Sequence, residues 1–509
     1  MAMATAELMN EEGNVQGQRS RNLVAVRVAV VIVSWLVLLL PSQEFGLEIY
    51  YLLSAILLGY LCMEVRNLPG DPFLPKILNP IVIASIGTFG CSMGGLLNFF
   101  VFADDYTRID FGWVAPLVNR EVYYVHLAMT LACTTAVLTW VSYYTNFGFK
   151  LFNLYMRLIP SSKFLSGEFD SKRLLAIVIV SMLIRYFLFK VGLHGRIVDS
   201  AKFGVKGYAA GTEYRHLGTF CYVALALTFI GHSRRPTHFT SGLRWVMLAY
   251  ELFFGFLFAA RSAIVYPFLI AFVTQSYCEK RISRPYVGLV VFSLIFAMSV
   301  GNEFKTYGLD NKYDEEIGVV DLLSDYVKKR GEYAAQQKQT ESFSSFVVNF
   351  ARHKGKVPEC AAAIQYASNY SGAQSSWFRQ KSIQEFSSAP IHGFVPRYIS
   401  GVGRPAWGYY FKNKVLKRNR KARYSIGFSP IGFLFLAGGT VAVLIFGFCY
   451  GIALRFTLQL VRRGDLGFLL YLALMSKLYD VHTVVPELII NGIRFLVFLP
   501  IAFWFLFKK

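Results

Sequence analysis

Residues 430–451 read PIGFLFLAGGTVAVLIFGFCYG, a run of 22 residues that contains no charged side chain. A helix rises about 1.5 Å per residue, so such a run is long enough to cross the hydrocarbon core of a bilayer. Lipid offers no water to unpaired backbone groups, and a spanning segment is therefore a helix or part of a closed barrel. Barrel strands are much shorter than this run, which consequently predicts a transmembrane helix.

The composition of the whole chain supports the same interpretation. The 509 residues are 55% hydrophobic and only 16% charged, and the mean hydropathy is +0.43. These values lie outside the range of soluble globular proteins. The seven cysteines are scattered, without the spacings that hold zinc or form redox dithiols. We therefore predict an all-α polytopic membrane protein.

Eleven other apolar runs bring the number of predicted transmembrane helices to about 12. The twelve runs lie near 23–40, 46–64, 79–101, 122–145, 174–192, 214–231, 244–260, 263–277, 286–300, 430–451, 465–479 and 485–507. The first run lacks a small-residue cleavage site at its end, so we expect it to be retained as a span. The predicted organisation is nine helices in 1–300, one large loop in 301–429 and three helices in 430–509.

The distribution of Lys and Arg predicts the orientation, because these residues are held on the cytoplasmic side of short connections. With the N-terminus inside, nineteen of them lie in cytoplasmic segments and seven in the opposite short loops. Both termini are then cytoplasmic and the large loop is outside. The basic run KNKVLKRNRKARYS, 412–425, argues for the reverse, although long loops largely escape the rule. On the cytoplasmic side this run would be an anchor for anionic lipids.

The large loop has the character of a functional segment. It holds 129 residues, far more than a connection needs, and it carries 20 Lys and Arg against 11 Asp and Glu. Its segments 319–337 and 342–367 contain enough apolar residues to form helices. We expect a mostly helical loop, with short helices on the membrane surface above a cavity between the spans.

Arginines gather on the outer side of the predicted topology. The stretch HGFVPRYISGVGRPAWG, 392–408, sets Arg397 and Arg404 next to prolines, and Arg261 and Arg196 lie in other outer loops. Guanidinium groups bond phosphate oxygens in pairs and stay charged at any pH. This pattern predicts a site for an anionic group, although solvated loop arginines, or snorkelling in the case of Arg261, would also explain it. No nucleic-acid-binding motif is present, and we expect no nucleic-acid partner.

The same residues carry a resemblance to a family. FVPRYI at 394–399, the Arg404-Pro405 pair and the Gly-punctuated span within 425–455 resemble the bacterial Wzy-type oligosaccharide repeat-unit polymerases, including the O-antigen polymerases. LFAARSAIVYPFLIAF, 257–272, resembles a Gly-x-Arg turn of that family, with Ala259 where glycine is usual. The chain departs from the family at Gly432-Phe433-Leu434-Phe435, where relatives often carry Gly-Glu-x-Tyr.

The resemblance implies a GT-C-like glycosyltransferase of the bacterial inner membrane. It would join undecaprenyl-diphosphate-linked oligosaccharide repeat units at the periplasmic face, with undecaprenyl diphosphate leaving, in the synthesis of O-antigen or a related surface polysaccharide. A chain-length regulator and a flippase would be further partners. A flippase or transporter for the same lipid-linked sugars, or an O-antigen ligase, are the alternatives.

Roles follow from the implied reaction. Arg261, Arg397, Arg404 and Arg196 would bind the departing diphosphate, and Arg397 and Arg404 would also act in catalysis. The acceptor hydroxyl needs a base, for which His392 is the first candidate and Glu303 the second, although a structural role suits His392 equally well.

Other side chains near these arginines suggest weaker roles. Tyr398 and Trp407 would stack on sugars or mark the membrane interface. ADDYTRID, 103–110, offers Asp104, Asp105 and Asp110 to a metal, but no His or Glu accompanies them, so we expect a metal-independent enzyme without a cofactor.

Three charged residues lie within predicted spans. Arg27, Glu48 and Arg185 are costly in contact with lipid, so we expect them to pair inside the bundle.

Overall fold

The computed structural model describes residues 23–40, 46–93, 123–158, 171–190, 204–257, 261–298, 300, 304, 307, 323–329, 356–369, 373–395, 429–478 and 485–507. Within these residues the regular elements are helices and there is no strand, so the all-α prediction is confirmed. Four helices are long and apolar enough to cross a membrane. They are α2 (Gly46–Asn67), α6 (Tyr123–Tyr143), α21 (Pro430–Val461) and α23 (Val485–Phe507).

Each of the other predicted spans also overlaps a helix. These helices are Leu23–Val37, α3 (Pro80–Ala84) with its π-helical continuation η2 (Ser85–Met93), α8 (Ser171–Lys190), α10 (Gly204–Arg234), α11 (His238–Leu257), α12 (Arg261–Glu279), α13 (Arg284–Met298) and α22 (Asp465–Leu478). That all twelve cross the bilayer stays a prediction. One further helix, α7 (Phe147–Leu158), lies in a stretch that we took to be a connection.

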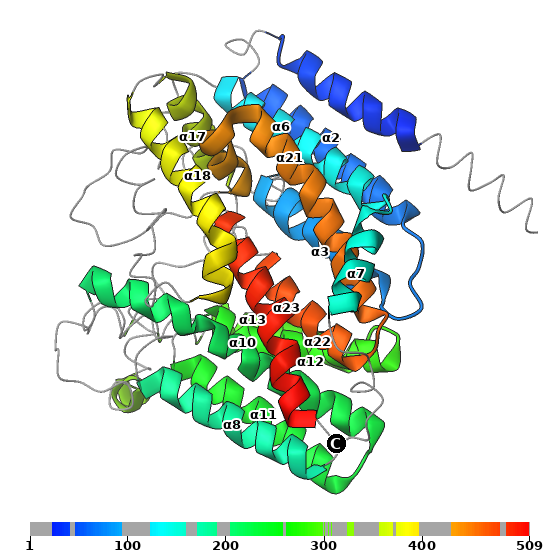
Figure 1. Ribbon diagram of the computed structural model, residues 1–509, viewed down its shortest axis with the longest axis vertical. Helices are drawn as coiled ribbons and strands as arrows, with labels where there is room; N and C mark the ends of the chain where they lie inside the picture. The colour runs from blue at the N-terminus through cyan, green and yellow to red at the C-terminus, as the bar shows by residue number, and fades with distance from the viewer. Residues whose placement is uncertain are drawn as a thin grey trace, which may run out of the picture.

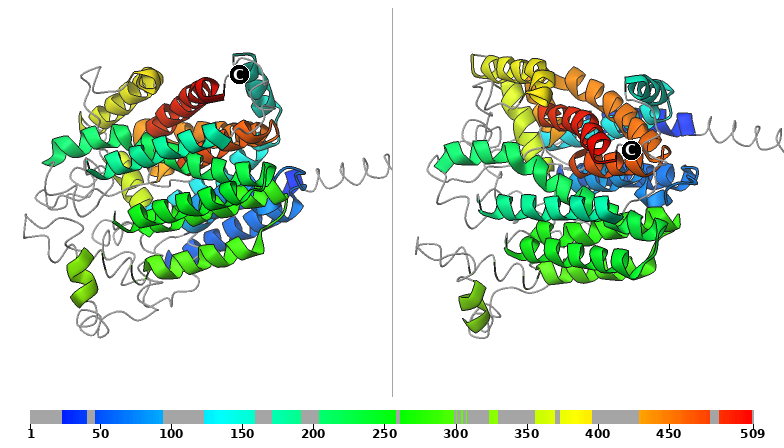
Figure 2. Two further views of the ribbon diagram at one scale, coloured as in Figure 1. Left: turned by 90° about the horizontal axis from the view of Figure 1, so that it is seen from below. Right: turned by 60° about the horizontal axis from the view of Figure 1, so that its bottom comes forward.

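The helices form two groups joined by the C-terminal pair (Figure 1). One group contains α2, α3, α6, α7 and α21, and the other contains α8 and α10 to α13. Helix α22 contacts both α21 and α10, and α23 contacts α22 and α8. In the views of Figure 2 the helices of the second group lie side by side. A stacked ring pair, Tyr277 on α12 and Phe468 on α22 with centroids 3.9 Å apart, ties the second group to the C-terminal pair.

Helices α6 and α21 form the closest contact of the first group. Gly447 and Gly451 of α21 face α6, and a Cβ atom at Gly451 would overlap the carbonyl of Thr139. The Thr139 hydroxyl donates to the carbonyls of Thr135 at 2.8 Å and of Gly447 at 3.0 Å. Glycines four residues apart allow the two backbones to approach closely, as is usual between membrane helices.

Helix α21 is kinked where the sequence has two consecutive glycines. Gly439 has φ +67° and ψ −158°, a backbone conformation that residues other than glycine rarely adopt. The kink separates a short N-terminal segment from the longer segment that packs on α6. Ser429 caps the N-terminal segment by accepting a hydrogen bond from the Gly432 backbone N–H at 3.1 Å, and Pro430 occupies the first turn.

The large loop contributes two helices to the bundle, α17 (Val357–Asn369) and α18 (Ala373–Phe394). Helix α17 contacts both α6 and α21, and its residues 360–364 are at most 2% exposed. The small side chains of Cys-Ala-Ala-Ala allow this burial, and Gly432 of α21 approaches the Cys360 backbone. Helix α17 is therefore packed against α6 and α21, and the location of the loop helices at the membrane surface stays a prediction.

Candidate functional site

Helix α18 turns a largely polar face toward the bundle. Its buried residues recur every three or four positions and so lie on one side of the helix: Phe378, Ser382, Glu385, Ala389 and His392. Three of these five are polar or ionisable. Burial of such groups is expensive unless they are paired or have a function.

The exposed side of α18 changes character along its length. The first half exposes Arg379, Lys381 and Gln384, whereas the last turn exposes the apolar residues Ile391 and Phe394. Ile391 is 60% exposed while the adjacent His392 is only 3% exposed. In a soluble protein a helix buries its apolar residues and exposes its polar ones. The end of α18 has the opposite arrangement, which is typical of a helix surrounded by lipid. The end of α18 therefore fits the hydrocarbon region better than water.

Helix α23 presents the facing polar residues. Glu487, Asn491 and Arg494 are spaced by four and three residues, which places them on one face of the helix. The Nη2 atom of Arg494 donates to the backbone carbonyl of His392 at 3.0 Å, so the Arg494 side chain reaches the end of α18. Arg494 is nine residues after Val485, or about 13 Å along the helix axis at about 1.5 Å per residue.

Helix α18 is held at both ends. At its start, Phe378 and Phe386 contact the ring of Phe433 in α21, with ring centroids 6.1 and 6.0 Å apart. At its end, a Cβ atom on Gly393 would lie 2.8 Å from the Ile493 side chain, so α18 and α23 are in close contact there. Figure 1 shows α18 and α23 side by side in the middle of the molecule.

We use the name α18–α23 seam for five residues, Glu385, His392, Glu487, Asn491 and Arg494. They combine a guanidinium group, an imidazole, two carboxyl groups and an amide between helices of an apolar bundle. Electrostatic interactions are stronger in such surroundings than in water. The seam can bind a charged or hydroxylated ligand, and its imidazole or carboxyl groups can accept a proton.

Of the site residues predicted from the sequence, His392 is the one whose side chain the structure describes, and it lies in this seam. Arg261 is the first residue of α12, but its side chain is outside the described part. Six other predicted site residues are also outside the described residues: Arg196, Glu303, Arg397, Tyr398, Arg404 and Trp407. The three aspartates considered for a metal, Asp104, Asp105 and Asp110, are outside them as well. The convergence of the outer arginines stays a prediction.

A small cluster connects the loop to the C-terminal end of α11. The ring of Phe304, the residue after Glu303, stacks on Phe256 with centroids 5.0 Å apart. Tyr307 lies in the same cluster, and its hydroxyl donates to the Asp325 carboxylate. That hydrogen bond, followed by the one from Lys329, lowers the pKa of Asp325. Burial and the contact with Asp325 raise the pKa of Tyr307 to about 12.

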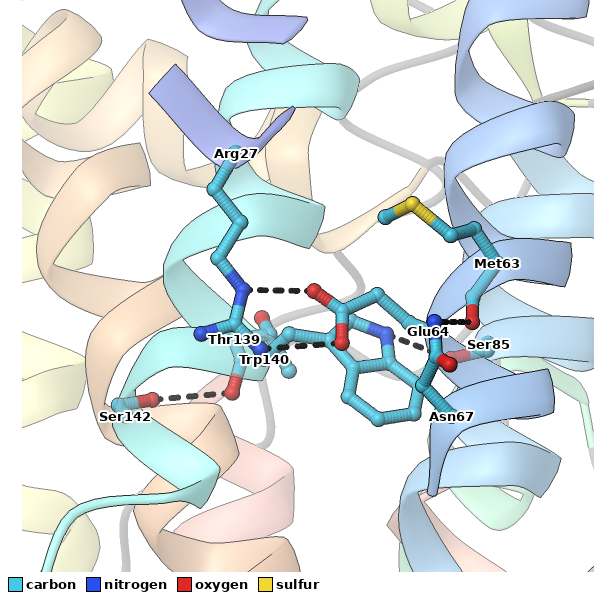
Figure 3. A network of polar contacts seen from close by, with 8 residues as sticks. All are labelled: Arg27, Met63, Glu64, Asn67, Ser85, Thr139, Trp140 and Ser142. Carbon is cyan, nitrogen blue, oxygen red and sulfur yellow. Dashed lines mark hydrogen bonds and ion pairs between the residues drawn. The ribbon is translucent and has the colours of Figure 1, made fainter. Parts of the chain in front are cut away.

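The arginines predicted to pair inside the bundle do so. Arg27 bonds Glu64 through Nε at 2.6 Å and Nη2 at 3.0 Å, as Figure 3 shows. Arg185 of α8 forms a buried ion pair with Glu251 of α11, with an Nε–Oε1 distance of 3.0 Å. The expectation for Glu48 is wrong, because this residue lies in the first turn of α2 and is exposed. Both pairs connect separate helices and have a structural role.

Three residues of the seam were missed from the sequence, namely Glu487, Asn491 and Arg494. The sequence of the 485–507 span does contain a signal for them, because three polar residues on one face of an apolar span indicate a partner helix or a ligand. What the sequence does not supply is the facing helix, since α18 comes from a loop about one hundred residues earlier in the chain. The described residues contain no group of three or more His, Cys, Asp and Glu side chains arranged to hold a metal ion.

Comparison with protein-family models, with curated proteins and with solved structures finds no match to this chain. Function is therefore argued from the site and from the resemblance of the sequence motifs.

Proposed function

We propose that this protein is a glycosyltransferase that polymerises undecaprenyl-diphosphate-linked oligosaccharide repeat units at the periplasmic face of the bacterial inner membrane. It would have about 12 spans, a GT-C-like arrangement and cytoplasmic termini. The observation that carries the proposal is the end of α18, where a loop helix brings buried His392 against Arg494 inside the bundle. Arg397 follows the last described residue of this segment, Val395, by two positions in the sequence.

The seam suits the chemistry of this reaction. A sugar hydroxyl of one lipid-linked unit attacks the anomeric carbon of the other, the bond from that carbon to the diphosphate oxygen breaks, and the hydroxyl proton passes to a base. His392 or Glu303 would accept the proton. Arg397, Arg404, Arg261 and Arg196 would stabilise the charge that develops on the diphosphate. The exposed apolar residues at the end of α18 leave this region open to substrates that arrive within the bilayer.

The two alternatives use the same lipid-linked substrate. A flippase would move it across the membrane without forming a glycosidic bond, and an O-antigen ligase would transfer it to the lipid A core. The large loop favours an enzyme, because its helices α17 and α18 both pack on α21 rather than on two matching halves of the bundle.

Deletion and complementation in the source bacterium, followed by gel analysis of the surface polysaccharide, tests the proposal. A polymerase deletion retains the one-repeat product and loses the ladder. Complementation with Arg397→Ala or Arg404→Ala should leave the ladder absent, whereas the loop control Lys417→Ala should restore it. Loss of every attached repeat would indicate a ligase, and absence of repeat units from the periplasmic face would indicate a flippase. Normal ladders from both arginine variants would contradict the proposed site.

A further inference from the structure

Helix α7 exposes a stripe of large apolar side chains. Its members are spaced by four, three and four residues, so they lie on one side of the helix: Phe147, Leu151, Leu154 and Leu158. Each of these four residues is between 47% and 76% exposed. Apolar residues that gather on one helix face form an interaction surface, unlike the single apolar residues that are common on protein surfaces.

The other sides of α7 differ from this stripe. One side packs on α21 and α23 through Gly148, Phe152 and Tyr155. A further side carries Lys150 and Arg157, which are two turns apart and exposed. The Nζ atom of Lys150 lies 5.8 Å from the centroid of the Phe147 ring, so the basic side borders the apolar stripe.

Helix α7 crosses α21 at a steep angle near the C-terminal end of α21 (Figure 1). Gly148 and Tyr155 are seven residues apart, or about 10 Å along α7. Both nevertheless contact the same turn of α21. A Cβ atom on Gly148 would lie 2.7 Å from the Arg455 side chain, and the ring centroids of Tyr155 and Phe456 are 5.5 Å apart. Because α21 is long and apolar enough to span a bilayer, a helix that crosses it near its end lies close to the plane of the membrane surface.

The surroundings of α7 are positively charged. The sequence from 122 to 167 contains no Asp or Glu. Helix α21 adds Arg455, and Arg463 follows this helix with its guanidinium carbon 5.3 Å from the centroid of the Phe152 ring. Within the described part of the chain, these two arginines and the two cations of α7 form no ion pair with a carboxylate. Their charge is therefore available to an anionic partner.

A lipid surface fits both properties of α7. In an interfacial helix, apolar residues enter the boundary of the acyl chains while Lys and Arg meet the phosphate groups of anionic lipids. A second copy of this chain fits less well, because a symmetric contact through α7 would bring the same four cations against each other.

We infer that α7 is an interfacial helix that binds a bilayer surface rich in anionic phospholipid. The stripe from Phe147 to Leu158 lies among the acyl chains, and Lys150 and Arg157 contact the phosphate groups. The inference is independent of the proposed function, since it concerns the membrane and not a glycan substrate.

Photocrosslinking identifies the partner of the stripe. The full-length protein carries p-benzoylphenylalanine in place of Leu154, in nanodiscs of equal parts phosphatidylcholine and phosphatidylglycerol, and mass spectrometry identifies the adducts. Phosphatidylglycerol adducts should exceed phosphatidylcholine adducts about fivefold, the factor expected from one cation close to an anionic surface. Lys150→Gln with Arg157→Gln should lower this ratio toward equality, whereas Lys150→Arg with Arg157→Lys keeps both charges and should keep the enrichment.

The matched control places the same crosslinker at Phe292 of α13, which is 60% exposed. Lipid adducts should form there too, and their ratio should not respond to the Lys150 and Arg157 variants. Lipid adducts at Phe292 without any at Leu154 would place the stripe in water and overturn the inference. An adduct of Leu154 with a second copy of this chain or with another protein would overturn it as well, and equal amounts of both lipid adducts in the parent protein would contradict the role of the cations.

Discussion

Two helix–helix contacts differ in the kind of side chain that they contain: the α6–α21 contact and the α18–α23 contact. The first joins glycines to threonines, and the hydroxyls of Thr135 and Thr139 donate to nearby backbone carbonyls. The second places ionisable and amide side chains on two helices, where Arg494 donates to the His392 carbonyl and the Asn491 oxygen has no partner among the described residues. Ionisable residues inside a membrane bundle form structural pairs, as Arg27–Glu64 and Arg185–Glu251 do, or belong to a functional site. The comparison supports the proposal that α6–α21 is the framework and that the α18–α23 seam is the functional part.

The largest loss of stability is expected when a methyl group is added at the contact between α6 and α21. Gly451→Ala would drive a Cβ atom into the Thr139 carbonyl, which belongs to a helix backbone and cannot move aside. Overpacking of this kind should destabilise the protein by about 3 kcal/mol or more. Thermal unfolding of the purified protein and its yield in the membrane measure the loss.

Gly288→Ala in α13 is the matched control, because a Cβ atom there meets no atom within 4 Å. Alanine should be neutral or should stabilise the helix by up to about 1 kcal/mol. Equal melting temperatures for the Gly451 and Gly288 variants would show that the α6–α21 contact is not the framework.

A smaller effect, on activity rather than on folding, is expected at Arg494. In the proposed enzyme it would be a positioning residue, since it bonds the His392 carbonyl at the end of α18, five residues before Arg397 in the sequence. Arg494→Gln should lower kcat by about 30-fold, the equivalent of about 2 kcal/mol for a charge-assisted hydrogen bond. Arg494→Lys keeps a charged donor and should recover part of the rate.

Polymerisation assays with the lipid-linked repeat unit measure both Arg494 variants, and their melting temperatures serve as the control for folding. If both variants lowered the melting temperature as well as kcat, and if Arg494→Lys recovered neither, Arg494 would be a structural residue of α23 and would not position the end of α18.

Gly393→Ala adds a methyl group at the α18–α23 contact, as Gly451→Ala does at the α6–α21 contact. The obstacles at Gly393 are the Cβ, Cγ2 and Cδ1 atoms of Ile493, and the Cβ atom is fixed to the α23 backbone, so the two helices must move apart at a stability cost of about 2 kcal/mol. In the proposed enzyme, the displaced end of α18 should also lower activity several-fold. The double variant Gly393→Ala with Ile493→Gly removes all three obstructing atoms and should regain activity, and a double variant slower than Gly393→Ala alone would contradict this account.

The sequence predicts the framework better than it predicts the seam. Apolar runs specify helices locally, and a charge inside such a run demands a counter-charge, so pairing of Arg27 and Arg185 could be expected. Their partners could not, because Glu64 and Glu251 lie 37 and 66 residues further along the chain. The same limit applies to α18, whose polar face makes sense only beside α23. Contacts between helices that are distant in the sequence depend on how the helices pack. No local sequence pattern identifies which helix will pack against which.

The smallest effect concerns the loop segment beside α11, and it depends on pH. The pKa of Asp325 is lowered from its ordinary value of 3.8, so the contact with Tyr307 stabilises the folded state above that pH and is lost as the pH falls through the lowered pKa. The pKa of Tyr307 is raised from 10.0 to about 12, so its contribution is complete below pH 10 and is lost as the pH rises through about 12. The segment should therefore be equally well docked across neutral pH and loosen at both extremes.

Hydrogen exchange of residues 323–329, corrected for the intrinsic effect of pH, measures this docking. Protection should be constant between about pH 5 and 9 and should fall progressively below pH 3.8, as the Asp325 carboxylate takes up a proton. Asp325→Asn removes the titrating group and should give lower protection at pH 6 with little further change as the pH falls. Wild-type protection that does not decline as the pH falls from about 6 to about 2 would mean that the Tyr307 contact does not hold the segment. The five residues of this cluster belong to neither α6 nor α21: Phe256, Phe304, Tyr307, Leu323 and Tyr326. The Asp325 variant should therefore leave the α6–α21 framework at its wild-type melting temperature.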